Sequence, residues 1–344
     1  MFPYDVFYAD AERDSIMKYL ITGGAGFIGS HLTEALLAAG NEVTVIDDFS
    51  TGTPENLKQI DGNFSLTVLE EDILSGPSLD SAVRECDCVI HLAAAVGVEL
   101  VVHDPVRTLV TNVHGSERVL TLAAEHHKRC ILASTSEVYG KSTKKLFKET
   151  DDLCIGPSTN SRWSYACSKL LDEFFLMALH RDKGLPGTVV RFFNTVGPRQ
   201  TGRYGMVLPR FVTAALEGRK LPVYGSGEQT RCFCHVKDVV RALLALIPEE
   251  RSYGKVFNIG TNRQISIRSL AELVNERTGN PAGIELIPYE KAYEPGFEDM
   301  LNRAPDCSAI RELCAWTPEI SLEQIIDDVS AFIRGEKNAS AGEQ

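Results

Sequence analysis

The chain has 344 residues, of which 44% are apolar, enough for one large or two medium domains with a substantial buried core. These values exclude a peptide hormone, a disordered tail and a small disulfide-stapled protein. Lys and Arg number 35 against 47 Asp and Glu, a formal net charge of −12. Because no basic run appears, neither nucleic acid nor an anionic membrane is expected as a partner.

Nothing in the sequence predicts export or membrane insertion. No stretch approaches the roughly 18 apolar residues of a membrane span, and the first residues, MFPYDVFYADAERDS, lack the order of a secretory signal. The nine cysteines never show the C-x-x-C spacing of structural zinc, so no metal site is expected. We therefore expect a cytoplasmic protein whose cysteines are reduced and mostly buried.

Short apolar runs alternate with helical patterns from residue 17 to residue 194. The candidate strands are KYLITGG, NEVTVIDDFS, FSLTVLEEDI, CDCVIHLAAA, RCILAST and TVVRFFN. The candidate helices are HLTEALLAAG, SLDSAVREC, TNVHGSERVLTLAAEHH and YACSKLLDEFFLMALHRDKG. This alternation predicts an α/β fold, a Rossmann-type doubly wound parallel sheet with helices on both faces.

A glycine-rich turn follows the first predicted strand. Gly23, Gly26 and Gly29 form G-x-x-G-x-x-G, where glycines allow a tight turn and close approach of the backbone to a pyrophosphate at a helix N-terminus. The second strand ends in Asp47 and Asp48, near the spacing of about 20 residues expected for a carboxylate that binds the adenosine ribose. A carboxylate there repels a 2′-phosphate, so we predict NAD rather than NADP. Asp47 is preferred because it comes first after the strand.

Tyr165 and Lys169 lie one helical turn apart in a Y-x-x-x-K pattern and so share one helix face. The lysine ammonium and an oxidised nicotinamide both stabilise a phenolate, which lowers the tyrosine pKa. The pair thus predicts a tyrosine that accepts a proton from a sugar hydroxyl near neutral pH.

These motifs resemble the extended short-chain dehydrogenase/reductase family, in its nucleotide-sugar branch. The matching pieces are TGGAGFIGSHL, VIDDFSTG, HLAAAVGV, STSEVYG, SYACSKLLDE, RFFNTVGPRQ, VYGSGEQTRCFCHVKDVV, VFNIGT and EDMLNRAPD. The resemblance implies a tightly bound NAD that is recycled, and a nucleoside diphosphate sugar, a UDP-sugar, that is oxidised transiently at C4. It also implies a homodimer through two apolar helices.

The resemblance assigns roles residue by residue. The implied catalytic residues are Thr135, Ser136, Glu137, Tyr165 and Lys169. The implied cofactor-binding residues are Gly23, Gly26, Phe27, Ile28, Gly29, Asp47, Asp48, Asp72, Ile73, Leu92, Ala93, Ala94, Asn112, Tyr165 and Lys169. The implied substrate-binding residues are Val98, Asn194, Val207, Tyr224, Arg231 and Arg303, of which Asn194 and Arg231 match diphosphate contacts and Arg303 one near the nucleotide's ribose.

The same reasoning divides the chain. We expect an N-terminal extension at 1–16 and a flexible tail at 335–344. The NAD-binding domain is expected to span 17–194 and to take back 235–262. A smaller C-terminal α/β nucleotide-sugar-binding domain is expected from 195–234 and 263–334.

The triplet from Thr135 to Glu137 bears on the reaction. Thr-Ser-Glu resembles the triplet of UDP-glucuronate decarboxylases, in which a C4 ketone lets the C6 carboxylate leave as carbon dioxide, giving UDP-xylose. Glu137 would help to order a proton or a water. The alternative is a UDP-sugar 4-epimerase acting on glucose and galactose or on glucuronate and galacturonate, because NTVGPRQTGRYGMVLPRF resembles bacterial epimerases. A 4,6-dehydratase and a non-catalytic nucleotide-binding protein are further alternatives.

Overall fold

The computed structural model describes residues 16–96, 104–202, 206–288 and 303–342, with side chains described as far as residue 335. Its larger part is a seven-stranded sheet in the order β11-β6-β5-β4-β1-β2-β3, in which every neighbouring pair is parallel. The strands are β1 (Lys18–Thr22), β2 (Glu42–Asp47), β3 (Leu66–Glu70), β4 (Cys88–His91), β5 (Arg129–Thr135), β6 (Gly187–Phe192) and β11 (Lys255–Ile259). The parallel sheet and the six strands predicted before residue 194 are confirmed.

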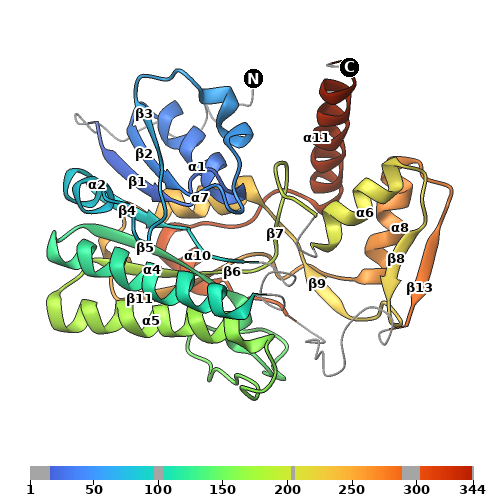
Figure 1. Ribbon diagram of the computed structural model, residues 1–344. Helices are drawn as coiled ribbons and strands as arrows, with labels where there is room; N and C mark the ends of the chain where they lie inside the picture. The colour runs from blue at the N-terminus through green and yellow to red at the C-terminus, as the bar shows by residue number, and fades with distance from the viewer. Residues whose placement is uncertain (1–15, 97–103, 203–205, 289–302, 343–344) are drawn as a thin grey trace.

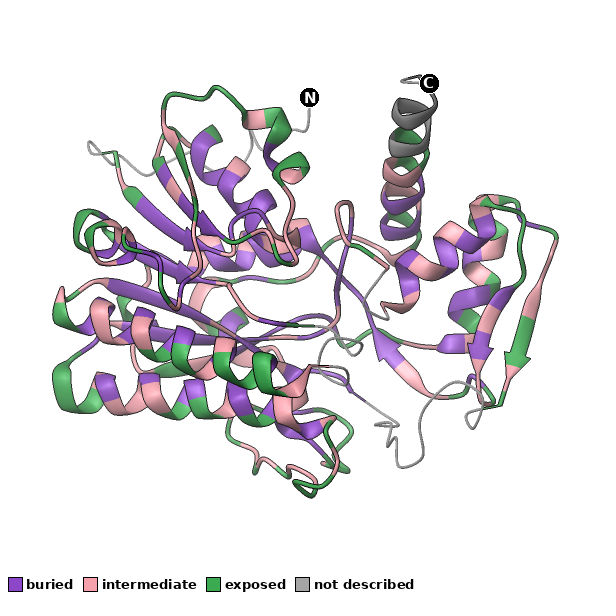
Figure 2. Cartoon of the chain, viewed as in Figure 1, coloured by how far each residue is buried: buried purple, intermediate pink, exposed green. Residues whose placement is uncertain are grey.

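Helices cover both faces of this sheet because most of its strands are apolar on both sides. One face packs against α1 (Phe27–Ala38), α7 (Val236–Leu246) and α10 (Ser308–Cys314). The other packs against α2 (Leu79–Glu85), α4 (Pro105–Glu125) and α5 (Trp163–Lys183). The layers are visible in Figure 1, and Figure 2 shows that the sheet strands are largely buried while α4 and α5 carry exposed outer positions. Short 3₁₀ helices are η1 (Pro54–Ile60), η2 (Ser136–Tyr139) and η3 (Glu250–Ser252).

A smaller lobe carries its own core. Its helices are α6 (Val207–Leu216), α8 (Ile267–Thr278) and α11 (Leu322–Gly342), whose apolar residues form one buried cluster. Short strands lie in this lobe and at its junction with the larger one: β7 (Thr195–Val196), β8 (Leu221–Tyr224), β9 (Thr230–Cys232), β10 (Cys234–His235), β12 (Gln264–Ser266) and β13 (Ile284–Ile287). They pair two by two, β7 with β10, β8 with β13 and β9 with β12. Figure 1 shows this lobe beside the carboxyl ends of the larger sheet.

One segment differs from the expected division of the chain. We expected 263–334 to belong to the smaller domain, yet Ile310 and Trp316 are buried in the core of the larger one. The reason is that the chain returns from the smaller lobe and packs α10 against β11 and α7. Part of the expected flexible tail, 335–344, belongs to α11, whose backbone is helical to Gly342, and its flexibility stays a prediction.

The order of the strands reverses between β1 and β4. From β1 the chain proceeds through β2 and β3 in one direction, and from β4 through β5 and β6 in the other. Ligands of doubly wound sheets bind at such a point, outside the carboxyl ends of the strands. There the last residues of the two strands, Thr22 and His91, are register partners.

Candidate active site

The turn from β1 into α1 has room only for glycine at two of its motif positions. A Cβ atom on Gly29 would lie 2.2 Å from the carbonyl oxygen of Gly23. Gly23 has φ +73°, and a Cβ atom on it would lie 2.7 Å from the backbone nitrogen of Ala93. Gly26 precedes the first residue of α1. The loop is thus packed closely at a helix N-terminus, and this fits the pyrophosphate of a dinucleotide.

Asp47, at the end of β2, holds this loop in place. Its Oδ2 accepts a hydrogen bond from the backbone nitrogen of Ala25 at 2.9 Å, and its Oδ1 accepts one from that of Phe49 at 2.9 Å. Burial raises the pKa of this carboxyl despite the two hydrogen bonds. Asp48 is exposed and binds the hydroxyl of Ser50 at 2.6 Å. The geometry therefore favours Asp47 as the ribose ligand, and this role stays a prediction.

Asn112 of α4 fastens the segment that follows β4, in which Leu92, Ala93 and Ala94 are the predicted cofactor contacts. Its Oδ1 accepts from the backbone nitrogen of Ala95 at 2.7 Å, and its Nδ2 donates to the carbonyl oxygen of the same residue at 3.2 Å. Asn112 thus positions the backbone along which the cofactor is expected to lie.

Four other predicted cofactor contacts lie at the start of α1 and in the turn after β3. Phe27 and Ile28 open α1 and are partly buried. Asp72 accepts from the backbone nitrogen of Leu74 at 2.8 Å, so its carboxylate caps its own turn. Ile73 is buried in the core beneath α4.

Tyr165 and Thr135 meet where β5 ends and α5 begins. The hydroxyl of Thr135 is hydrogen-bonded to Tyr165 and also accepts from the backbone nitrogen of Glu137 at 3.2 Å, which caps η2. Burial raises the pKa of Tyr165, the charge of Glu137 raises it further, and the bond to Thr135 opposes them. Lowering of this pKa by Lys169 stays a prediction; in the structure the lysine ammonium is paired with Asp172.

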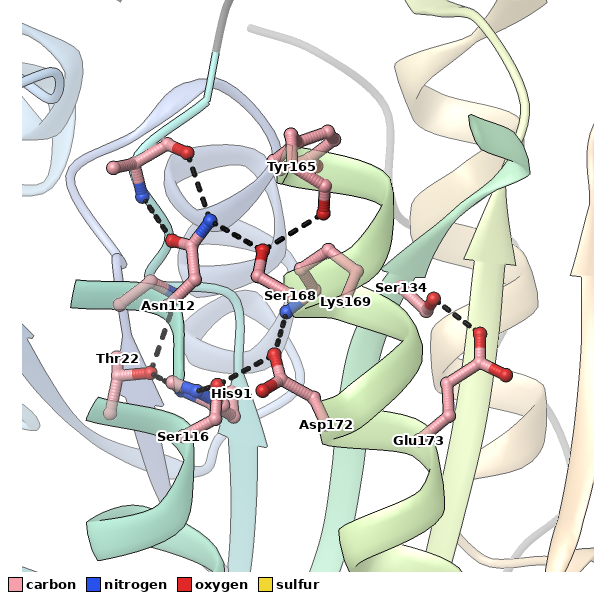
Figure 3. A network of polar contacts seen from close by, with 12 residues as sticks. Thr22, His91, Asn112, Ser116, Ser134, Tyr165, Ser168, Lys169, Asp172 and Glu173 are labelled. Atoms are coloured by element: carbon pink, nitrogen blue, oxygen red, sulfur yellow. Dashed lines mark hydrogen bonds and ion pairs between the residues drawn. The ribbon is translucent and has the colours of Figure 1, made fainter. Parts of the chain in front are cut away.

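Lys169 forms a buried ion pair with Asp172 of the same helix. Its Nζ lies 2.8 Å from Asp172 Oδ2, and both side chains are 2% exposed. Burial raises the pKa of Asp172, while Lys169 and the hydroxyl of Ser116 act against that rise. Figure 3 shows this pair at the centre of a polar network that extends to His91. Sequence reasoning missed Asp172.

Glu137 lies between two guanidinium groups. Its Oε1 is paired with Arg303, and its Oε2 lies 3.3 Å from Nη2 of Arg162. Burial would raise the pKa of Glu137, but Arg303, Arg162 and the more distant Arg231 outweigh it, so the pKa lies below its ordinary value. Glu137 is therefore ionised at neutral pH. Its neighbour Ser136 is buried.

Two of these residues bear on the sequence predictions. The resemblance implied a place for Arg303 near the nucleotide's ribose, which stays a prediction, and the structure pairs its guanidinium with Glu137. The chain at 303–306 returns beside η2, where the backbone nitrogen of Phe147 bonds the carbonyl oxygen of Ala304. Arg162 carried no predicted role, although it lies one helical turn before Tyr165 on the chain.

The remaining predicted substrate contacts line the smaller lobe and its junction with the larger one. Asn194 follows β6 and donates to the carbonyl oxygen of Cys232 at 3.0 Å. Arg231 of β9 is buried. Tyr224 ends β8, and its hydroxyl accepts from Arg210 at 2.7 Å. Val207 opens α6, and Val98 lies outside the described residues.

The described residues also bear on two other classes of site, a metal centre and a membrane span. No group of three or more His, Cys, Asp or Glu side chains there is placed to hold a metal ion. None of the described helices is both long and apolar enough to cross a membrane.

Comparison with known proteins identifies close relatives of this chain. A UDP-N-acetyl-alpha-D-glucosaminuronate decarboxylase of Bacillus cytotoxicus is 41% identical over 322 residues, which cover 93% of this chain and 99% of that protein. UDP-glucuronic acid decarboxylase 1 of Arabidopsis thaliana is 36% identical over 308 residues, covering 90% of this chain and 68% of that one.

A solved structure of a different activity is also similar. The UDP-glucuronic acid 4-epimerase of Bacillus cereus, in complex with UDP-glucuronic acid and NAD, superposes with a TM-score of 0.80 and is 27% identical, covering 93% of this chain and 100% of that one. The NAD dependent epimerase/dehydratase family matches residues 19–260. The glycine loop, the tyrosine and lysine pair and these comparisons lead to one conclusion: the chain belongs to the NAD-dependent epimerase/dehydratase family.

Proposed function

We propose that this enzyme decarboxylates a UDP-hexuronate, with UDP-glucuronate as substrate and UDP-xylose and carbon dioxide as products. The observation that carries the proposal is the position of Glu137, ionised beside Tyr165 and held by Arg162 and Arg303. Two guanidinium groups contact this carboxylate, and a third, that of Arg231, acts on it from further away. The surplus of positive charge suits a substrate that brings a diphosphate and a sugar carboxylate.

The cofactor of this family fits the first lobe. Gly23, Gly26 and Gly29 would hold the pyrophosphate, and Asp47 the adenosine ribose. NAD bound there would supply reversible hydride-transfer chemistry at C4 of the sugar.

The chain's own residues carry the proton transfers. Tyr165 takes the proton of the C4 hydroxyl, which Thr135 orients, while Lys169 supports the tyrosine. The resulting C4 ketone lies β to the C6 carboxylate, so the C5–C6 bond breaks, carbon dioxide leaves and the electron pair forms an enolate. C5 then takes up a proton. Because Glu137 is ionised, it orders the donor or a water rather than giving up a proton of its own.

The second candidate is a UDP-hexuronate 4-epimerase. The specific observation in its favour is the Bacillus cereus structure, whose ligand carries the same sugar carboxylate. An epimerase needs the sugar to turn within the site and has no use for an acid or base near C5. The Glu137 cluster therefore favours decarboxylation.

Product analysis separates these reactions. The purified protein is incubated with UDP-glucuronate, UDP-N-acetylglucosaminuronate or UDP-glucose, and the products are followed by mass and proton NMR. Loss of carbon dioxide from a uronate supports the proposal, and the two uronates together identify the C2 substituent, since the relatives differ there. A product of unchanged mass and inverted C4 would establish epimerisation.

We further propose that the enzyme is a cytoplasmic homodimer. The helices α4 and α5 pack side by side and expose large apolar side chains to solvent: Val106, Leu109, Val110, Leu171 and Phe174. A second copy of this pair of helices would cover them. All nine cysteines are free thiols, which is typical of a reducing compartment. Sedimentation of the purified protein tests the dimer.

A further inference from the structure

Three side chains of α5 form one stripe that leads away from the reacting end of the site. Tyr165, Lys169 and Asp172 lie at positions i, i+4 and i+7 of the helix and so share a face. Lys169 Nζ donates to Asp172 Oδ2 at 2.8 Å. The lysine ammonium that is expected to support a Tyr165 phenolate therefore has a buried carboxylate on its other side.

A chain of hydrogen bonds fixes that carboxylate. Ser116 of α4 donates its hydroxyl proton to Asp172 Oδ2 at 2.8 Å, so its oxygen is left to accept from His91 Nε2 at 3.0 Å. His91 Nδ1 then accepts from the hydroxyl of Thr22 at 2.6 Å. Burial lowers the pKa of His91 to about 3, and the neutral ring fits this assignment of one donor and one acceptor. In this assignment every hydrogen bond from Thr22 to Ser116 donates toward Asp172, and Figure 3 shows the four side chains in a row.

The direction of these bonds has an electrostatic consequence. Asp172 Oδ2 accepts two hydrogen bonds in a site from which water is excluded, since Ser116, Lys169 and Asp172 are all buried. An ammonium paired with a carboxylate has no net charge, and its field at Tyr165 is weaker than that of an isolated ammonium. The hydrogen bonds that link Thr22, His91 and Ser116 thus hold the Asp172 carboxylate in place, and its negative charge offsets the positive charge of Lys169.

We propose that Asp172 is a positioning residue that fixes the Lys169 ammonium and offsets its charge, so that Tyr165 stays protonated until further positive charge arrives with the oxidised cofactor. This inference rests on the proposed function, in which Tyr165 is the base. As a consequence, Tyr165 loses its proton when the bound cofactor is oxidised and regains it when the cofactor is reduced. A cycle of oxidation and reduction at C4 requires both steps.

Other titratable groups also face this stripe. The charge of Glu137 in η2 raises the pKa of Tyr165, and His91 of β4 stays neutral. Glu173, next to Asp172, is paired with Arg191 of β6 at 2.7 Å. Substitution of Asp172 alone leaves each of these residues in the chain.

The test is the titration of Tyr165 in the NAD⁺-loaded protein without sugar, read as phenolate absorbance. Because no turnover is involved, the result is independent of the proposed reaction, which product analysis tests separately. D172N is isosteric and can accept both bonds at its amide oxygen, so it removes the charge alone. The absorbance of the corresponding Y165F protein, with and without D172N, is subtracted to remove the other tyrosines.

We expect D172N to lower the titration midpoint of Tyr165 by about one pH unit, as for a unit charge two helical turns away in a protein interior. Ser116→Ala is the matched control, since it removes one hydrogen bond of the chain and keeps the charge, and it should not lower the midpoint. Asp172→Ser, neutral and smaller, replaces D172N if the latter does not fold. A midpoint equal to or above that of the wild type, or no Tyr165 phenolate in the variant below pH 10, would overturn the proposal.

Discussion

The carboxylate of Glu137 is paired with the guanidinium of Arg303, although 166 positions separate the two residues in the sequence. The pair brings the loop after β5 together with the segment that enters α10. Arg162, from the start of α5, completes the cluster on the opposite carboxylate oxygen. The Glu137 cluster is therefore built from three parts of the chain, and its glutamate is held as an anion.

Glu137→Gln tests the role of that anion. The amide keeps the shape of the side chain and removes its charge, so we expect release of carbon dioxide to fall by roughly 10²-fold or more. Reduction of bound NAD by the substrate should persist, because Tyr165 and Lys169 are unchanged. Stopped-flow absorbance of the reduced nicotinamide and release of carbon dioxide are measured on the same samples. Decarboxylation at the wild-type rate would contradict this role.

Tyr165→Phe separates the first proton transfer from the later steps. Without the phenol no group takes the proton of the C4 hydroxyl, so both cofactor reduction and product formation should fall by roughly 10²-fold or more. Binding of UDP-glucuronate, measured by calorimetry, should change little. A variant that reduces its cofactor normally but forms no product would show that another group acts as the base.

Arg162→Met is expected to change the pH dependence of kcat/KM. Burial favours the neutral form of Glu137, and Arg303 and Arg162 together overcome it. Loss of Arg162 therefore raises the pKa of Glu137, and activity that needs the ionised glutamate is lost at a higher pH as the solution is acidified. We expect the acid limb of the kcat/KM profile to move up by about one pH unit.

Arg162→Lys is the matched control for that profile, because it keeps the positive charge while changing the geometry. Its acid limb should stay near that of the wild type even if its rate is lower. An acid limb that moves equally in both variants would mean that packing of the arginine, rather than its charge, sets the pH dependence.

Gly29→Ala tests the cofactor loop. The new Cβ atom would lie 2.2 Å from the carbonyl oxygen of Gly23, so the loop must shift. We expect the Kd for NAD to rise at least tenfold, by loss of about 1.4 kcal/mol or more of binding free energy. Gly335→Ala, where no atom lies within 4 Å, is the control and should bind NAD as the wild type does. Equal affinities in the two variants would contradict a dinucleotide site at this loop.

The sequence predicted what depends on local spacing. Strands and helices followed from periodicity, and the glycine loop, Asp47 and the Tyr165 and Lys169 pair are each local patterns beside predicted elements. The contact of Arg303 with Glu137 depends on how the chain returns across the sheet, which no local pattern encodes. Asp172 follows Lys169 by three residues on the same helix face, and this spacing could have indicated the ion pair between them. A carboxylate near a lysine on a helix is, however, also typical of a solvent-exposed pair.

In the proposed reaction the sugar loses its C6 carboxylate and gains a proton at C5. Incubation of the purified enzyme in deuterated water with UDP-glucuronate labelled with ¹³C at C6, followed by NMR, follows both changes at once. We expect labelled carbon dioxide in amounts equal to a UDP-pentose that carries deuterium at C5. A labelled uronate that retains C6 and is inverted at C4 would contradict this expectation and establish an epimerase.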